Sequence, residues 1–114
     1  MVGQFERWLV AEGWQVHREV DYCDVVAHRG AERLFAEAKG RTASIGLDVD
    51  TLYGQLLRRV PTVAGAGVRL GVVVPTEGRT AALRVAGEVR RLLGITVYVV
   101  GESGGVTPLG PEDS

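Results

Sequence analysis

The chain has 114 residues, of which 46% are hydrophobic and 24% are charged, and its formal net charge is −1. This composition describes one soluble globular domain and excludes a polycation that would coat nucleic acid through bulk charge. The lone cysteine, Cys23, excludes an intrachain disulfide framework and a multi-thiolate zinc finger. No apolar run could span a membrane and the start does not read as a signal peptide, so we expect a cytoplasmic protein.

The first third of the chain predicts a helix followed by three strands. Apolar residues recur at helical spacing over residues 2–12, and Gly13 ends that pattern. Three short strand-like segments follow, at residues 14–20, 23–28 and 33–39. The connections between these segments are short enough for an antiparallel meander.

The rest of the chain predicts alternating helices and strands. We expect a loop over residues 40–46, a helix capped by Asp48 or Asp50 that runs to about Val60, before Pro61, and a buried strand over 69–74. The remaining expected elements are a helix over 79–93 closed by Gly94, a strand over 95–100 and a short edge strand over 106–108.

This order of elements predicts an α/β fold. Its core is α-β-β-β-α-β, with a mixed central sheet flanked by helices, and a third helix and a C-terminal strand follow. We expect a single domain over residues 1–110 and a disordered tail over 111–114.

Positive charge is distributed unevenly along the sequence. Residues 40–95 contain eight basic and four acidic side chains, whereas residues 1–39 and 96–114 are net acidic. The basic middle allows one local anion-binding face, and solvated helix faces are the alternative. Of the 13 basic residues, 12 are Arg and only Lys39 is Lys.

The single lysine lies in a pattern that suits metal-dependent hydrolysis. On a strand, Glu37 and Lys39 share one face while Ala38 points to the other. Twelve residues separate Asp24 from Glu37, enough for a hairpin that brings the two carboxylates together. Two carboxylates and the Ala38 carbonyl suit Mg²⁺ or Mn²⁺, which prefer oxygen ligands. Lys39 would then lie beside the metal-activated water and the scissile phosphate, where an Arg could not readily substitute.

These residues resemble the signature of the PD-(D/E)xK, or restriction-endonuclease-like, nuclease superfamily. That family has an α-β-β-β-α-β core, with an Asp on its second strand and Glu-x-Lys on its third. Asp24, Glu37 and Lys39 match this signature, and the resemblance covers about residues 2–74; Cys23 stands where the family usually has Pro. The resemblance implies a Mg²⁺- or Mn²⁺-dependent deoxyribonuclease, and the pattern is nearest to the Holliday-junction-resolvase and helicase-linked branches.

Some branches of this family have two further site residues. A Glu on the first helix corresponds to Glu6 here, and a Gln on the helix after the third strand corresponds to Gln55. The alternative for either residue is a place on an exposed polar helix face.

Four residues are candidates for contact with DNA. Arg58 and Arg59 share a helix face with Gln55, and we expect them to hold the DNA backbone together with Arg41. Tyr53 is a fourth candidate, for which core packing is the alternative.

Two other interpretations remain open. A non-catalytic nucleic-acid or protein interaction module could keep this fold, and a nuclease of this size would need a homodimer to cut both strands. A zinc site at His17, Cys23 and His28 is not expected, since these residues lack a fourth ligand.

Overall fold

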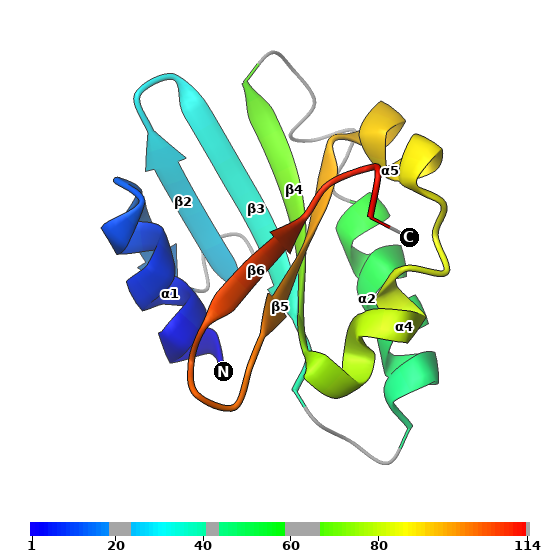
Figure 1. Cartoon of the computed structure of the whole chain (residues 1–114). Coiled ribbons are helices and arrows are strands. Elements are labelled where there is room, and N and C mark those ends of the chain that lie inside the picture. The colour runs from blue at the N-terminus through cyan, green and yellow to red at the C-terminus, as the bar shows by residue number, and fades with distance from the viewer. Residues whose placement is uncertain (19–23, 41–43, 59–66, 114) are drawn as a thin grey trace.

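The computed structural model describes residues 1–18, 24–40, 44–58 and 67–113, and within them a six-stranded sheet carries helices on both faces (Figure 1). No helix of this described part is long and apolar enough to cross a membrane. In chain order the elements are α1 (Val2–Ala11), β1 (Gln15–Arg18), β2 (Val25–Arg29), β3 (Glu32–Ala38), α2 (Ile45–Leu57), β4 (Val68–Pro75), the 3₁₀ turn η2 (Thr76–Gly78), α4 (Arg79–Ala82), α5 (Gly87–Leu93), β5 (Ile95–Val100) and β6 (Val106–Leu109).

The strands lie in the sheet in their chain order, β1-β2-β3-β4-β5-β6. β1, β2 and β3 form the antiparallel meander, β3, β4 and β5 run parallel, and β6 returns antiparallel to β5. Parallel neighbours need a crossover, which α2 supplies between β3 and β4, and η2, α4 and α5 supply between β4 and β5. The predicted α/β fold with a mixed sheet flanked by helices is confirmed.

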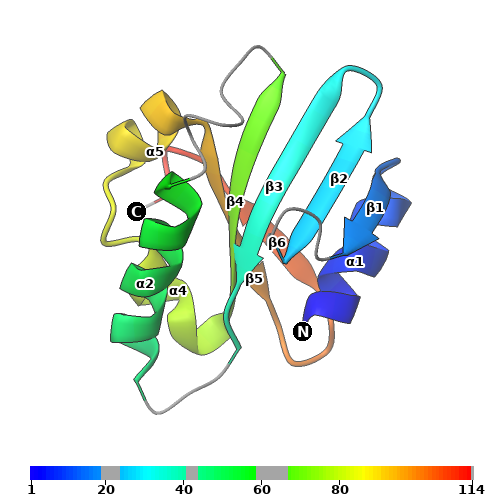
Figure 2. The ribbon, with the colours of Figure 1, turned by 180° about the vertical axis from the view of Figure 1, so that it is seen from behind.

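Each face of the sheet has its own apolar core because side chains alternate along every strand. On one face Phe5 and Leu9 of α1 pack with Leu34 and Ala36 of β3. On the other face α2 packs through Leu52 and Leu56 against Phe35 of β3 and against β4. Figure 2 shows α2 on this second face. Odd-numbered residues of β3 therefore face α2, and even-numbered residues face α1.

The cap of helix α2 is Ser44, four residues before the first predicted cap, Asp48. Ile45 packs against the apolar core on the α2 face, and the Asp48 N–H donates to the Ser44 carbonyl oxygen at 2.9 Å. Packing of Ile45 against the core extends the helix at its start. This tertiary contact cannot be read from the acidic residues that suggest a helix cap in the sequence.

The single helix predicted over residues 79–93 is wrong: the chain forms η2, α4 and α5, and the helical turns break between Ala82 and Gly87. At the start of α5 the chain lies close to its own C-terminal segment. A Cβ at Gly87 would lie 1.8 Å from the Pro111 carbonyl oxygen, so α5 can begin there only because residue 87 has no side chain.

Residues 110–113, most of which were expected to be a disordered tail, form a turn fixed to α5. Arg90 is fully buried, and its guanidinium donates to the carbonyl oxygens of Val85, Gly110 and Asp113 at 3.0, 3.1 and 2.7 Å. A buried guanidinium needs acceptors for its N–H groups, and the C-terminal carbonyls provide two of them.

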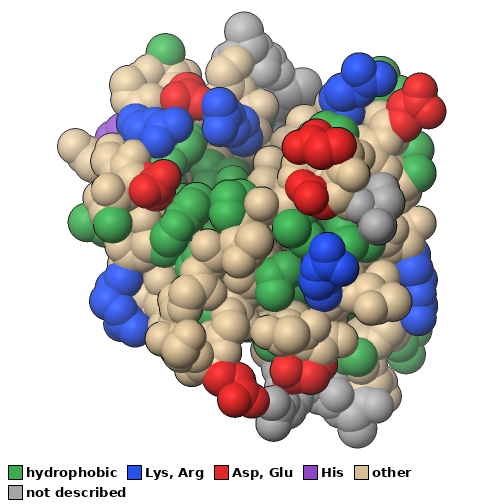
Figure 3. All heavy atoms as spheres, in the orientation of Figure 1, with side chains coloured by type: hydrophobic (Ala, Val, Ile, Leu, Met, Phe, Trp, Pro, Cys, Tyr) green, Lys and Arg blue, Asp and Glu red, His purple; other side chains and the backbone are tan. Residues whose placement is uncertain are grey.

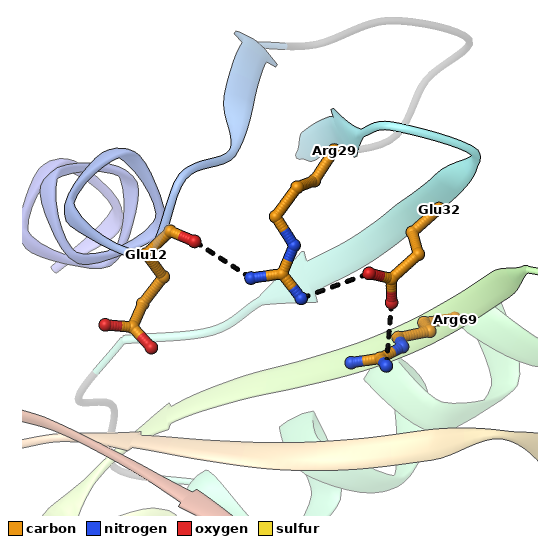
Figure 4. Close-up of polar contacts among 4 residues, drawn as sticks. All are labelled: Glu12, Arg29, Glu32 and Arg69. Carbon is orange, nitrogen blue, oxygen red and sulfur yellow. Dashed lines mark hydrogen bonds and ion pairs between the residues drawn. The ribbon is translucent and has the colours of Figure 1, made fainter.

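A polar cluster holds the β2–β3 hairpin in place (Figure 4). Arg29 donates to the Glu12 carbonyl oxygen at 2.8 Å and pairs with Glu32 at 3.2 Å, and Glu32 pairs with Arg69 of β4 at 2.7 Å. The Arg29 guanidinium carbon also lies 4.5 Å from the centre of the Trp14 ring. These contacts tie the end of α1 and the start of β4 to the hairpin, whose register decides which residues meet at its other end.

Candidate metal site at the end of the β2–β3 hairpin

The register of β2 and β3 places Asp24 across from Glu37. Val25 is the partner of Ala36, so Asp24, one residue before β2, faces Glu37 at the end of the hairpin. The Asp24 Oδ2 atom accepts a hydrogen bond from the Ala38 N–H at 2.9 Å. The carboxylate thereby continues the β2–β3 ladder where the backbone of β2 ends, and it is fixed beside the Glu37-Ala38-Lys39 segment.

Glu37 and Lys39 extend from the α2 face of the sheet, with different exposure. Glu37 is 5% exposed and its neighbour on β4 is Val72, whereas Lys39 is exposed. The Lys39 N–H donates to the Val73 carbonyl oxygen at 3.0 Å, so the pairing with β4 continues to this residue. A nearly buried carboxylate requires hydrogen-bond donors or a cation around it, and an exposed ammonium at its side can reach a bound substrate.

The oxygen atoms gathered here suit a hard divalent cation. Mg²⁺ is commonly held by one or two carboxylates and keeps several waters, so Asp24 and Glu37 are a sufficient protein contribution. Within the described residues no three His, Cys, Asp or Glu side chains cluster as ligands, so a site here would use these two carboxylates and backbone oxygen. Ala38 offers that backbone atom: its N–H is engaged by Asp24, and its carbonyl stays the expected third ligand.

Glu6 lies on the other side of the sheet. It is a half-buried residue of α1, the helix whose Phe5 and Leu9 pack on the face opposite to Glu37. The structure therefore does not bring Glu6 onto the face that carries Glu37 and Lys39.

Gln55 and Arg58 are exposed and lie at the far end of α2 from the carboxylates. The helix starts just after β3 ends and runs back along the sheet (Figure 2). Gln55 is ten residues beyond Ile45, about 15 Å along the helix axis. Neither Gln55 nor Arg58 is gathered with Asp24 and Glu37.

Of the other candidates for DNA contact, Tyr53 is a core residue. Its side chain is 5% exposed and its hydroxyl donates to the Ala82 carbonyl oxygen at 2.6 Å, so the prediction that it contacts nucleic acid is wrong and the packing interpretation holds. Burial raises the pKa of Tyr53 to about 12, and the Arg90 charge lowers it in part. Arg41 and Arg59 lie outside the described residues.

A pocket beside the site escaped the sequence interpretation. It has a volume of about 200 Å³ and opens at the carboxyl ends of β3, β4 and β5, where Gly40 and Thr76 line it together with Met1 and Gln4 at the start of α1; none of the three proposed site residues lines it. Gly40 directly follows Lys39. Open α/β sheets usually bind ligands at the carboxyl ends of their parallel strands. The residues that directly follow the buried strands β4 and β5 could therefore have indicated this pocket from the sequence.

Solved structures share this fold, among them two that align over almost the whole chain. A XisH family protein from Nostoc punctiforme aligns with a TM-score of 0.65 and 16% identity over 92% of this chain and 94% of that chain. An fdxN element excision controlling factor protein from Anabaena variabilis aligns with a TM-score of 0.65 and 17% identity over 93% of this chain and 94% of that chain. At such identity the likeness concerns the fold alone. Comparison of the sequence with protein families and with curated proteins gives no match.

Proposed function

We propose that this chain is a metal-dependent nuclease that hydrolyses phosphodiester bonds in DNA. The observation that carries the proposal is the hydrogen bond from the Ala38 N–H to Asp24 Oδ2, at 2.9 Å. It fixes the Asp24 carboxylate beside the strand segment that carries Glu37 and Lys39. The resemblance to PD-(D/E)xK nucleases rests on these three residues.

Each residue of the site has a distinct role in this proposal. Asp24 and Glu37 bind Mg²⁺ or Mn²⁺, with the Ala38 carbonyl as a further ligand. The bound cation supplies a water of lowered pKa and positive charge against the phosphate. The Lys39 ammonium orients the attacking water and offsets the negative charge that develops on the phosphate oxygens.

Glu6 and Gln55 have no catalytic role in this proposal. Glu6 belongs to the helix on the opposite face, and Gln55 lies near the distant end of α2. Because one chain presents one such site, cutting both strands of a duplex would take two copies, and a homodimer remains part of the proposal.

The alternative function is an interaction module that keeps the fold without catalysis. The observation that favours it is the neighbour from Anabaena variabilis, whose name describes a factor that controls excision. A controlling factor can act by binding alone. Metal-dependent cleavage distinguishes the two functions.

The test is a cleavage assay with purified protein, Mg²⁺ or Mn²⁺, and duplex, single-stranded or branched DNA. We expect cleavage by the wild type, and a loss of about 100-fold or more for Asp24→Asn and for Lys39→Ala, because each removes a group that acts on the reacting atoms. The matched control is Asp50→Asn, an exposed carboxylate of α2 whose loss should leave the rate unchanged.

Two outcomes would contradict the proposed nuclease. Equal cleavage by the wild type, Asp24→Asn and Lys39→Ala would identify a contaminating nuclease. No cleavage of any substrate by folded wild-type protein, with either metal, would favour the interaction module.

A further inference from the structure

Three strands present an ordered set of side chains on the α2 face of the sheet. The register places Gln15 beside His28 and His28 beside Arg33, which forms one row across β1, β2 and β3. The next row contains His17, Val26 and Phe35. Asp24 and Glu37 form the third row. Successive rows are two residues apart along the strands, or about 7 Å.

The first row and His17 of the second row are accessible from the β1 side of the sheet, whereas Val26 and Phe35 of the second row are buried in the core. Gln15, His17 and Arg33 are exposed and His28 is half-buried, because α2 packs against β3 and β4 (Figure 2). The rings of His17 and His28 are stacked, with centroids 5.2 Å apart and an angle of 12° between their planes. The Arg33 guanidinium carbon lies 5.0 Å from the Phe35 ring centre.

These groups have the chemistry of a nucleic-acid surface. A guanidinium binds phosphate oxygens, and a flat pair of imidazoles offers both N–H donors and an aromatic face on which a base can stack. Arg58, the C-cap residue of α2, is exposed at the same end of the sheet as Arg33 and adds a second guanidinium there.

We propose that the open face of β1–β3, made of Gln15, His17, His28 and Arg33, binds one strand of the substrate nucleic acid and leads it to the carboxylate row. Arg33 contacts the phosphate backbone and the His17–His28 pair contacts the next nucleotide. The two acidic side chains of the third row repel phosphate, so the strand is held by the first two rows and only its reacting phosphate approaches Asp24 and Glu37. The inference rests on the proposed function and assigns the path of its substrate.

The α1 face of the sheet differs in charge, because its described arginines on β2 and β4 are paired with an acid. Figure 3 shows that side, where basic and acidic side chains are interspersed. The basic residues Arg29 and Arg69 there are paired with Glu32. Charge complementarity with a polyanion therefore favours the α2 face.

The test measures binding without cleavage. Fluorescence anisotropy in EDTA gives the Kd of wild-type protein for labelled single-stranded DNA, single-stranded RNA and duplex DNA at two salt concentrations. We expect Arg33→Gln and the double variant His17→Gln/His28→Gln to raise the Kd by about 3- to 10-fold, and Arg33→Gln to reduce the salt dependence by about one counterion. Arg33→Lys should restore most of the affinity, since a cation on phosphate is kept.

Arg7→Gln is the matched control, because Arg7 is an exposed arginine of α1, on the opposite face. An unchanged Kd for Arg33→Gln and the double variant, an equal loss for Arg7→Gln, or no binding by the wild type would overturn the inference. Failure of this inference can be distinguished from failure of the proposed function. If metal-dependent cleavage requires Asp24 but binding does not depend on Arg33, the nuclease proposal stands and the proposed substrate path is wrong. If binding depends on Arg33 but the protein cleaves no DNA, the inferred surface stands and the nuclease proposal is wrong.

Discussion

At the scale of single residues, Tyr53 shows how one buried hydroxyl couples stability to pH. Its phenol donates to the Ala82 carbonyl oxygen, and burial raises its pKa from the usual value of about 10 to about 12. The folded protein therefore holds this proton more tightly than the unfolded chain does. The resulting stabilisation is complete below pH 10 and is lost as the pH rises toward 12.

We expect Tyr53→Phe to lower the free energy of unfolding by about 1 kcal/mol at pH 8, because the hydrogen bond to Ala82 is lost. The difference between variant and wild type should shrink above pH 10, as the wild type alone loses its Tyr53 contribution. Urea denaturation from pH 8 to 11.5 measures both effects. A difference that stays constant across this range would contradict the raised pKa. Tyr98, whose pKa is also raised by burial, is present in both proteins and cancels in the comparison.

The sequence predicted some residues of the candidate site better than others, for a physical reason. Glu37 and Lys39 share a face because side chains alternate on a strand, and this follows from their spacing alone. The bond that fixes Asp24 joins residues fourteen positions apart, and its Ala38 donor could not be read from the sequence. Glu6 lies on the first helix as predicted, but a helical pattern does not say which face of the sheet the helix covers.

At the scale of elements, the positions of Gly87 and Gly54 show that the same substitution can act in opposite directions. A Cβ at Gly87 would meet the Pro111 carbonyl oxygen at 1.8 Å, whereas a Cβ at Gly54, in the last turn of α2, would have nothing within 4 Å. The first glycine allows the C-terminal turn to pack on α5. The second only weakens a helix.

We expect Gly87→Ala to destabilise the protein by about 1–3 kcal/mol, because the C-terminal segment must move and its contacts with Arg90 are disturbed. Gly54→Ala should stabilise it by about 0.5–1 kcal/mol through helix propensity. Thermal or urea unfolding of the two variants checks both signs. Equal effects of the two substitutions would contradict the close packing at residue 87.

The strands and the helices differed in how well local patterns predicted them. The three strands of the meander and the buried strand β4 were predicted because short segments with apolar residues between turn residues are typical of strands. The break before α5 was missed because residues 79–93 read as one periodic segment, and the contact of Gly87 with Pro111 beside the break joins residues far apart in the sequence. Arg90 inside the core was missed because a charged residue normally predicts an exposed position.

At the scale of the whole molecule, the basic segment of the chain and the inferred nucleic-acid surface do not coincide. Residues 40–95 are the basic segment, yet the inferred surface is built mainly from His17, His28 and Arg33, which precede it. Sheet register brings these side chains together across three strands. A net charge of −1 is compatible with such a surface because binding depends on the local arrangement of charge.

The proposed nucleic-acid surface and the proposed metal site lie at opposite ends of the same strands. Stacked imidazoles and Arg33 lie toward the β2–β3 turn, and the carboxylates lie at the other end of the same strands, beside the pocket at the ends of the parallel strands. The fold by itself does not establish chemistry. Chemistry here depends on whether Asp24 and Glu37 bind one cation together.

Calorimetric titration with Mn²⁺ tests that claim most directly. Wild-type protein should bind one Mn²⁺ per chain, and Asp24→Asn and Glu37→Gln should each abolish or greatly weaken binding, while Asp50→Asn binds as the wild type does. Circular dichroism of each variant verifies that it is folded. Absence of binding by the wild type at millimolar Mn²⁺, or binding that survives both substitutions, would contradict the account.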